Sequence, residues 1–210
     1  MDAAIAAVLT QYEQRGAEEH KLQLKGTMEE WLERRDEFLI AVGPATGQLL
    51  NILAKSVKAR TILELGTSYG YSTIWLAEAA RATGGRLITL EKAVYKQDYA
   101  RQMLAKAGLA AHVDFRLGDV RETIATLAGP FDFVLVDVWK ELYVECFDLF
   151  YPKLSPGAFI AADNMLLPEN YREDALKYRK HVRSKPKIDS VLLPVGSGVE
   201  LSRYGDPVPA

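Results

Sequence analysis

Short apolar runs alternate with longer amphipathic segments from residue 61 to the end of the chain. The apolar runs fall at 61–65, 86–91, 112–118, 131–137 and 158–163. Segments with helical periodicity follow them, over about 71–82, 95–107, 120–127, 141–151 and 169–183. Gly and Pro punctuate the pattern, at Gly84-Gly85, Gly108, Gly129-Pro130 and Pro156-Gly157. Repeated strand–helix–strand units with apolar strands predict a mostly parallel sheet that is covered by helices on both faces.

The last apolar runs break this alternation. Residues 188–194 and 198–204 are separated only by Gly196-Ser197-Gly198, a sequence typical of a hairpin turn. The sheet is therefore expected to have seven strands, with an antiparallel C-terminal hairpin at or near its edge.

A helical prefix precedes the first strand. Residues 2–15 are amphipathic, and Gly16 is expected to end this helix. The apolar face consists of Ile5, Val8, Leu9 and Tyr12. Thr27 is expected to cap a second helix that runs to residue 42, with Glu30 at the capping-box position. Gly43-Pro44 ends that helix, and Pro44 can open the next one.

These patterns predict one domain of 210 residues, a length that supports one α/β core. Residues 1–57 form the prefix, which can lid a site or provide a homodimer face. Residues 58–205 form the α/β core, and residues 206–210 are expected to be a frayed tail.

The stretch TILELGTSYGYS, residues 61–72, is a strand that turns through glycine into a helix. Such turns hold nucleotide-like ligands, because glycine lets the backbone approach the ligand and the helix N-terminus offers free N–H groups. The spacing Glu64-x-Gly66-x-x-x-Gly70 is neither a dinucleotide fingerprint nor a triphosphate loop. An acid at the strand end suits a ligand with a positive end and no phosphate, such as S-adenosylmethionine, although an ordinary tight turn would look similar.

The predicted strands end on acids or on their neighbours. In an open α/β sheet, ligands bind outside the carboxyl ends of the strands, so these residues should meet at one edge. They are Glu64 and Gly66, Glu91, Gly118-Asp119, Asp137, and Asp163-Asn164. Glu91 could accept hydrogen bonds from ribose hydroxyls. Asp119 could hold an adenine amino group, cap the following helix, or do both.

Asp137, Asp163 and Asn164 form a set of hard oxygen ligands on adjacent strand ends. This set suits Mg²⁺, or alternatively Mn²⁺ or Ca²⁺, and does not suit zinc. The two acids could instead merely cap helices. Lys140 could sit beside the metal, where the cation would depress its pKa, and accept a proton from a hydroxyl; a lysine in a first helical turn is otherwise usually a solvated charge.

Net charge, hydrophobic run length and cysteine count limit the kinds of partner and the cellular location that we expect for this protein. A net charge of -2 argues against a broad electrostatic grip on nucleic acid or on an anionic membrane. The basic run 177–187 is the only support for a nucleic-acid methyltransferase or binder, and a solvated helix face explains it better. No run approaches the length of a membrane span. The single cysteine, Cys146, excludes an internal disulfide and fits a cytoplasmic location.

Six segments together carry a family resemblance. They are VGPATGQ (42–48), LELGTSYGYS (63–72), LITLE (87–91), DVWKELY (137–143), ADNMLLP (162–168) and GVE (198–200). The chain resembles the class I, cation-dependent O-methyltransferases, and within them the catechol O-methyltransferases, from about residue 38 to 201. The resemblance implies a Rossmann-like, S-adenosylmethionine-dependent methyltransferase fold.

The resemblance also implies roles for individual residues. The cofactor would be held by Val42, Glu64, Gly66, Tyr71, Ser72, Glu91, Asp119 and Asp137. Mg²⁺ would be held by Asp137, Asp163 and Asn164, with Lys140 as the general base. The substrate would contact Lys140, Asn164 and Glu200, with Phe38, Trp139 and Pro168 as an apolar wall; Glu200 matches the acid that binds the second catechol hydroxyl.

Val138 and Lys92 depart from the family pattern, in which histidine follows the acid that matches Asp137 and methionine follows the acid that matches Glu91.

From the resemblance we expect Mg²⁺-dependent methyl transfer to a hydroxyl of a small vicinal dihydroxy aromatic compound, a catechol. Two alternatives remain: a cation-dependent enzyme for larger phenolics such as caffeoyl thioesters or flavonoids, and a non-catalytic S-adenosylmethionine-binding module.

Overall fold

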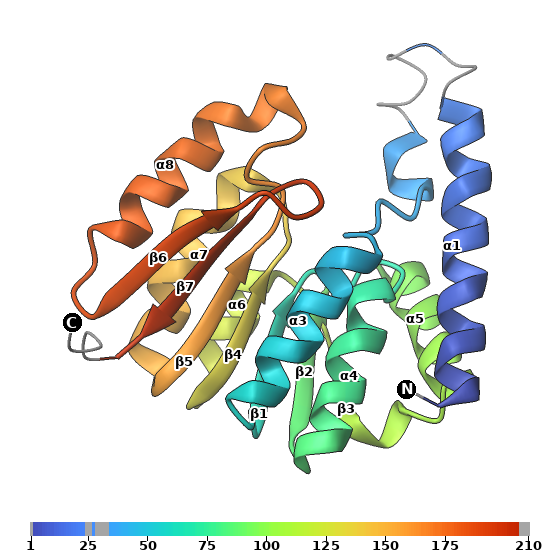
Figure 1. Cartoon of the computed structure of the whole chain (residues 1–210), viewed down its shortest axis with the longest axis horizontal. Helices are drawn as coiled ribbons and strands as arrows, with labels where there is room; N and C mark the ends of the chain where they lie inside the picture. Colours follow the sequence, from blue (N-terminus) through green and yellow to red (C-terminus); the bar gives the residue numbers. More distant parts are fainter. Residues whose placement is uncertain (1, 24–26, 28–33, 206–210) are drawn as a thin grey trace.

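The computed structural model describes residues 2–23, 27 and 34–205. These residues form one seven-stranded sheet with helices packed against it (Figure 1). The strand order is β3-β2-β1-β4-β5-β7-β6. The strands are β1 (Thr61–Leu65), β2 (Arg86–Glu91), β3 (Val113–Leu117), β4 (Phe131–Val136), β5 (Leu154–Ala162), β6 (Ile188–Leu193) and β7 (Val199–Tyr204). Strands β1 to β5 pair in parallel, and β7 pairs antiparallel with both β5 and β6. The predicted seven-stranded sheet and its antiparallel hairpin are therefore confirmed.

Helices cover both faces of the sheet. Successive side chains of a strand point to opposite faces, and in the central strands the side chains on both faces are apolar. The α-helices are α1 (Ala3–Gln23), α3 (Pro44–Ser56), α4 (Tyr71–Thr83), α5 (Val94–Lys106), α6 (Val120–Thr126), α7 (Tyr143–Phe150) and α8 (Arg172–Arg183). Short 3-10 turns lie at Arg35–Glu37, Ala110–His112, Lys140–Leu142, Tyr151–Lys153 and Glu169–Tyr171. No helix among these described residues has the length and apolar character needed to cross a membrane.

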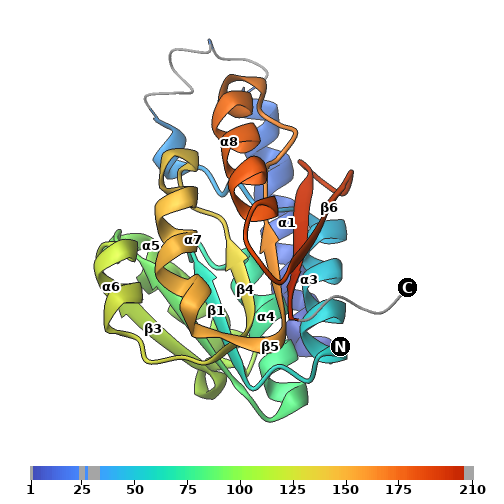
Figure 2. The same cartoon turned by 90° about the vertical axis from the view of Figure 1, so that its left-hand side faces the viewer.

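Two separate hydrophobic cores result. Ile62 and Phe133 face α1, α3, α4 and α5, whereas Leu63 and Val134 face α6, α7 and α8. Figure 2 shows α3 and α7 on opposite sides of β1, β4 and β5. The two-faced burial explains why the central strands read as nearly continuous apolar runs.

The helical prefix differs from its prediction in two places. Gly16 does not end α1, which continues to Gln23. A glycine inside a helix costs only about 1 kcal/mol, and the buried face of α1 offsets that cost. The predicted helix from Thr27 to residue 42 lies partly outside the described residues. Within them, Arg34 is helical, Arg35–Glu37 is a 3-10 turn, and residues 38–43 are irregular, with Ile40 at φ 41°.

Element boundaries also differ slightly in the second half of the chain. Strand β5 begins at Leu154, so Pro156-Gly157 lies inside it and does not precede it. The register between β4 and β5 shifts between Phe131 and Phe133, which accommodates the extra residues. These differences leave the carboxyl ends of the strands where the sequence predicted them.

Candidate active site

A cavity of about 850 Å³ lies at the carboxyl edge of the sheet. Its walls come from the segments that follow β1, β2, β3, β4 and β5, and from parts of the prefix. The lining includes Gly66, Glu91, Asp119, Asp137, Trp139, Lys140, Asn164 and Pro168. A small adjoining hollow shares Gly66 and Asp137 with it and is lined by Val42, Tyr71 and Ser72. The structure thus brings most of the predicted residues to one place.

Gly66 is required where β1 turns toward α4. Its φ is 98°, and a Cβ there would lie 2.1 Å from the carbonyl oxygen of Asp137. The amides of Gly66 and Thr67 both donate to the carbonyl of Leu90. A side chain at position 66 would therefore push apart the loop and the end of β4, and only glycine fits.

Glu91 holds the loops around it through its carboxylate. One oxygen, Oε2, accepts the Ser68 amide at 2.8 Å. The other, Oε1, accepts the amides of Lys92 and Ala93, both at 2.9 Å. Glu91 also lines the cavity, so its carboxylate is placed to meet a ligand there.

Glu64 lies beneath the turn that follows β1. It is fully buried, does not line the cavity or the hollow, and accepts hydrogen bonds from three hydroxyl groups. The donors are Ser72 at 2.6 Å, Thr73 at 2.7 Å and Thr89 at 2.6 Å. These hydrogen bonds connect β1 with β2 and with the start of α4, beneath the glycine-containing turn.

Burial raises the pKa of Glu64 to about 7, although the three hydroxyl groups oppose the shift. Between pH 4.5 and 7 the folded protein binds a proton here that the unfolded chain has released, so stability falls as pH rises. Glu64→Gln should remove this decline, which amounts to about 3 kcal/mol at most. The measurement is urea unfolding from pH 4.5 to 7.5.

Glu78→Gln is a matched control for this prediction. Burial raises the pKa of Glu78, but hydrogen bonds from Lys55 and Asn51 lower it overall. Its contribution therefore has the opposite sign and is lost as pH falls. An unchanged pH dependence in Glu64→Gln would contradict the prediction.

Asp119 caps α6. Its Oδ1 accepts the Arg121 amide at 2.9 Å, and the Arg121 guanidinium pairs with both carboxylate oxygens. This hydrogen bonding lowers the pKa of Asp119 to about 2. Asp119 also lines the cavity, so capping and ligand contact are compatible at this residue.

Asp137, Asp163 and Asn164 follow the adjacent strands β4 and β5. The Asp137 amide donates to Leu65, and the Asp163 amide donates to Val136, which fixes both strand ends. Asp163 is 1% exposed, and its Oδ1 has no hydrogen-bond partner. Burial and the charge of Asp137 raise the pKa of Asp163 to about 8. Burial likewise raises the pKa of Asp137, against the effect of Lys140.

Lys140 is 5% exposed and belongs to the same cluster. Its Nζ donates to Tyr143 Oη at 2.5 Å and to Asn164 Oδ1 at 3.3 Å. Burial lowers the pKa of Lys140 to about 8, while Asp137 and Asp163 oppose the shift. A solvated surface lysine is therefore ruled out.

Tyr143 is a residue whose contribution the sequence did not reveal. It is fully buried, receives Lys140 and donates to the carbonyl of Asp163 at 3.2 Å. It thereby joins the lysine to the strand end that carries Asp163. Its signal in the sequence was its place three residues after Lys140, one helical turn away.

Two predicted substrate contacts lie outside the cavity lining. Glu200 on β7 is fully buried and pairs with Arg179 at 3.0 Å and Arg183 at 2.6 Å, both on α8. It also accepts the Ser190 hydroxyl at 2.7 Å. The pleat turns Glu200 toward α8, so its carboxylate does not line the cavity. Phe38 is buried beside the cavity wall, whereas Trp139 and Pro168 line it.

The prefix, the start of α5 and the segment after β5 supply further lining residues that sequence reasoning missed. They are Asp36, Ile40, Tyr95, Lys96 and Tyr171. No local pattern marks them, because long-range folding brings them to the strand ends.

A deep cavity at the carboxyl edge of a sheet wound on both faces defines an α/β protein that binds a ligand at its strand ends. The chain belongs to the O-methyltransferase family, whose model matches residues 13–204. The predicted methyltransferase fold and the predicted enzyme class are thereby confirmed.

Individual relatives agree with this assignment. The chain is 40% identical to a catechol O-methyltransferase of Niastella koreensis over 167 residues, which cover 73% of this chain and 75% of the relative. It is 29% identical to caffeoyl-CoA O-methyltransferase 1 of Eucalyptus globulus over 177 residues, which cover 75% and 72%. The solved O-methyltransferase TomG of Streptomyces achromogenes, in complex with SAM, matches with a TM-score of 0.76 and 27% identity, covering 98% of this chain and 91% of that one.

Proposed function

We propose that the chain transfers a methyl group from S-adenosylmethionine to one hydroxyl of a catechol, with the help of a divalent cation. One observation carries this proposal. The buried amine of Lys140 lies beside Asn164 at the cavity wall and close to Asp137, which also lines the cavity. Asp163 is buried and does not line the cavity, and its Oδ1 has no hydrogen-bond partner.

The residues that line the cavity are of the types that would bind S-adenosylmethionine. Gly66 and Glu91 line it where the backbone turns close to the ligand space, and Asp119 lines it after β3. Val42, Tyr71 and Ser72 form the hollow beside it. Carboxylates suit a ligand that carries a positive sulfonium and ribose hydroxyls. The TomG structure in complex with SAM supports the same ligand for this family.

The oxygen atoms of Asp137, Asp163 and Asn164 fit a hard cation such as Mg²⁺. The unpartnered Oδ1 of Asp163 is buried, and a cation would satisfy it. Among the residues described, no group of three or more His, Cys, Asp or Glu is suited to a metal, and the proposed set consists of two carboxylates and the Asn164 amide.

When bound, S-adenosylmethionine supplies an electrophilic methyl group, and the cation lowers the pKa of the hydroxyl. Lys140 accepts the proton of that hydroxyl at Nζ. Tyr143 and Asn164 hold the amine in place through their hydrogen bonds. Trp139 and Pro168 provide an apolar wall that orients an aromatic ring and excludes water.

The charges around the cavity favour a small catechol over a thioester that carries phosphates. The acidic lining residues are Asp36, Glu91, Asp119, Asp137 and Glu169, and the basic ones are Lys92, Lys96 and Lys140. Lys96 is already paired with Asp36 at 3.1 Å, and Lys140 lies among carboxylates. The lining contains no cluster of free cations in its described part that would bind phosphates.

The test is methyl transfer from S-adenosylmethionine to 3,4-dihydroxybenzoate or caffeate, with Mg²⁺ and then with EDTA. We expect a monomethyl ether that forms with Mg²⁺ and is lost with EDTA. A caffeoyl thioester in parallel separates the two substrate classes. Activity that persists in EDTA would remove the metal from the proposal, and tight cofactor binding without any methylation would support the non-catalytic module.

A further inference from the structure

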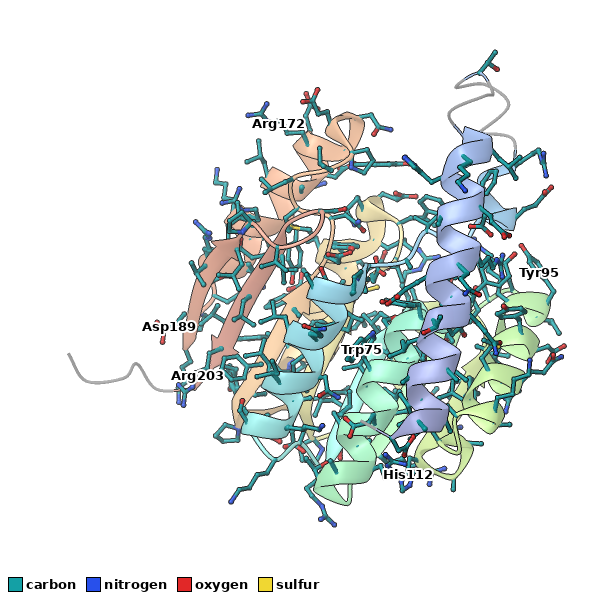
Figure 3. The ribbon with its side chains drawn as sticks, turned by 45° about the vertical axis from the view of Figure 1, so that its right-hand side comes forward. Trp75, Tyr95, His112, Arg172, Asp189 and Arg203 are labelled. Carbon is teal, nitrogen blue, oxygen red and sulfur yellow. The ribbon has the colours of Figure 1, made fainter. Side chains whose placement is uncertain are left out.

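The long helix α1 touches the walls of the cavity without lining it. It packs against α4 and α5 with Ile5, Val8, Leu9 and Tyr12 buried. Figure 3 shows α1 in front of these helices, with Tyr95 at one end of α5. None of the cavity-lining residues belongs to Ala3–Gln23. Any effect of α1 on a ligand must therefore act through other residues.

The first connection runs from α1 to the glycine-containing loop, residues 66–70. Tyr12 is fully buried, and its hydroxyl donates to the carbonyl of Tyr69 at 2.6 Å. Gly66, Ser68 and Gly70 in this loop have φ values of 98°, 46° and 94°. Glycine adopts positive φ freely, so Ser68 is the residue of this loop whose conformation needs support from its neighbours.

The second connection runs from α1 to a strap, which we define as residues 36–40. Glu19 accepts the Leu39 amide at 2.7 Å and Arg15 Nε at 2.6 Å. Arg15 donates through Nη2 to the carbonyl of Glu37 at 3.0 Å. Residues 38–40 of the strap are not helical, so the hydrogen bonds from the strap to Arg15 and Glu19 hold it in place.

The strap and the loop also join each other across the cavity wall. The Tyr69 hydroxyl donates to the carbonyl of Asp36 at 3.1 Å. The Arg15 guanidinium carbon lies 4.1 Å from the centre of the Tyr69 ring. Asp36 and Ile40 of the strap, and Gly66 and Ser68 of the loop, line the cavity. One helix therefore anchors two segments that face the same ligand space.

We propose that Tyr12, Arg15 and Glu19 are positioning residues, through which α1 holds the loop and the strap in their ligand-binding arrangement. This inference rests on the proposed function, because the ligand is the cofactor S-adenosylmethionine. Without the Tyr12 hydroxyl, the buried Tyr69 carbonyl has no hydrogen-bond partner, which favours loop conformations in which water reaches this carbonyl. The apparent Kd for the cofactor then rises in inverse proportion to the fraction of molecules that keep the binding conformation.

The experiment compares Tyr12→Phe with wild type by calorimetric titration with S-adenosylhomocysteine and by steady-state kinetics. We expect Kd for S-adenosylhomocysteine and KM for S-adenosylmethionine to rise about three- to tenfold. We expect kcat at saturating cofactor and KM for the catechol to stay within about twofold, because Lys140 and the substrate wall are untouched.

Tyr151→Phe is the matched control. Its hydroxyl donates to the carbonyl of Pro186, also at 2.6 Å, on a part of the molecule that does not line the cavity. It should leave both cofactor constants unchanged. Glu19→Gln is a second variant that keeps the shape of the side chain and weakens the hold on Arg15, and it should raise the same two constants.

Each outcome decides something specific. Wild-type binding of S-adenosylhomocysteine together with unchanged constants in both variants would overturn the role of α1. A proportional loss of kcat and affinity with a lowered Tm would show a merely structural helix and would also overturn it. Failure of the wild type itself to bind S-adenosylhomocysteine would overturn the proposed function, and the positioning role with it.

Discussion

Replacing Lys140 with alanine is expected to lower kcat by roughly 10²–10⁴-fold, the range typical for loss of a general base. The reason is the position of the amine, which is buried beside Asn164 and Tyr143 at the cavity wall. Cofactor binding should remain, because Lys140 donates its hydrogen bonds to Tyr143 and Asn164, neither of which is proposed to hold the cofactor. The measurements are methyl transfer at saturating catechol and titration with S-adenosylhomocysteine.

Lys177→Ala provides the control, since Lys177 is exposed on α8 and does not line the cavity. It should leave kcat unchanged. If Lys140→Ala turned over substrate at the wild-type rate, Lys140 would have no part in the mechanism.

The second large effect is expected at Asp163. Asp163→Asn keeps the size of the side chain and removes the charge of a buried carboxylate whose Oδ1 has no partner. We expect activity to fall by about 10²-fold or more and the Mg²⁺ concentration for half-maximal activity to rise at least about tenfold. A magnesium titration of activity measures both quantities.

Asp148→Asn is the corresponding control, because Asp148 on α7 pairs with Lys185 and His181 away from the cavity. Its magnesium dependence should match that of the wild type. An Asp163→Asn enzyme with the wild-type magnesium requirement would remove Asp163 from the metal set.

The prefix shows where prediction from sequence fails. Local pattern suggested that Gly16 ends a helix and that residues 27–42 form another. In the structure α1 passes through Gly16, and Arg15 and Glu19 on either side of it make long-range hydrogen bonds. The described residues 38–43 are not helical, and the Leu39 amide donates to the Glu19 carboxylate. Neither partner is visible from helical periodicity.

Two acids show the same limit within the candidate site. Glu64 was expected at the site because it lies near the end of an apolar run, as Glu91 does, and Glu200 because the family resemblance implies it. Glu64 turns toward Ser72, Thr73 and Thr89, and Glu200 toward Arg179 and Arg183. The face of the strand on which an acid lies decides whether it meets the cavity or the packed interior.

The expected homodimer and the expected cytoplasmic location stay predictions.

By itself, the sequence determined the order of strands and helices, the parallel sheet with its terminal hairpin, and the cluster of acids at the strand ends. Those features follow from local periodicity, glycine and proline, and from the rule that parallel strands end at one edge. Only the tertiary structure decided which acids face the cavity, how burial holds Lys140 against Tyr143, and how α1 reaches the loop and the strap. These are contacts between residues far apart in the chain, and they exist only once the packed core has fixed the direction of each side chain.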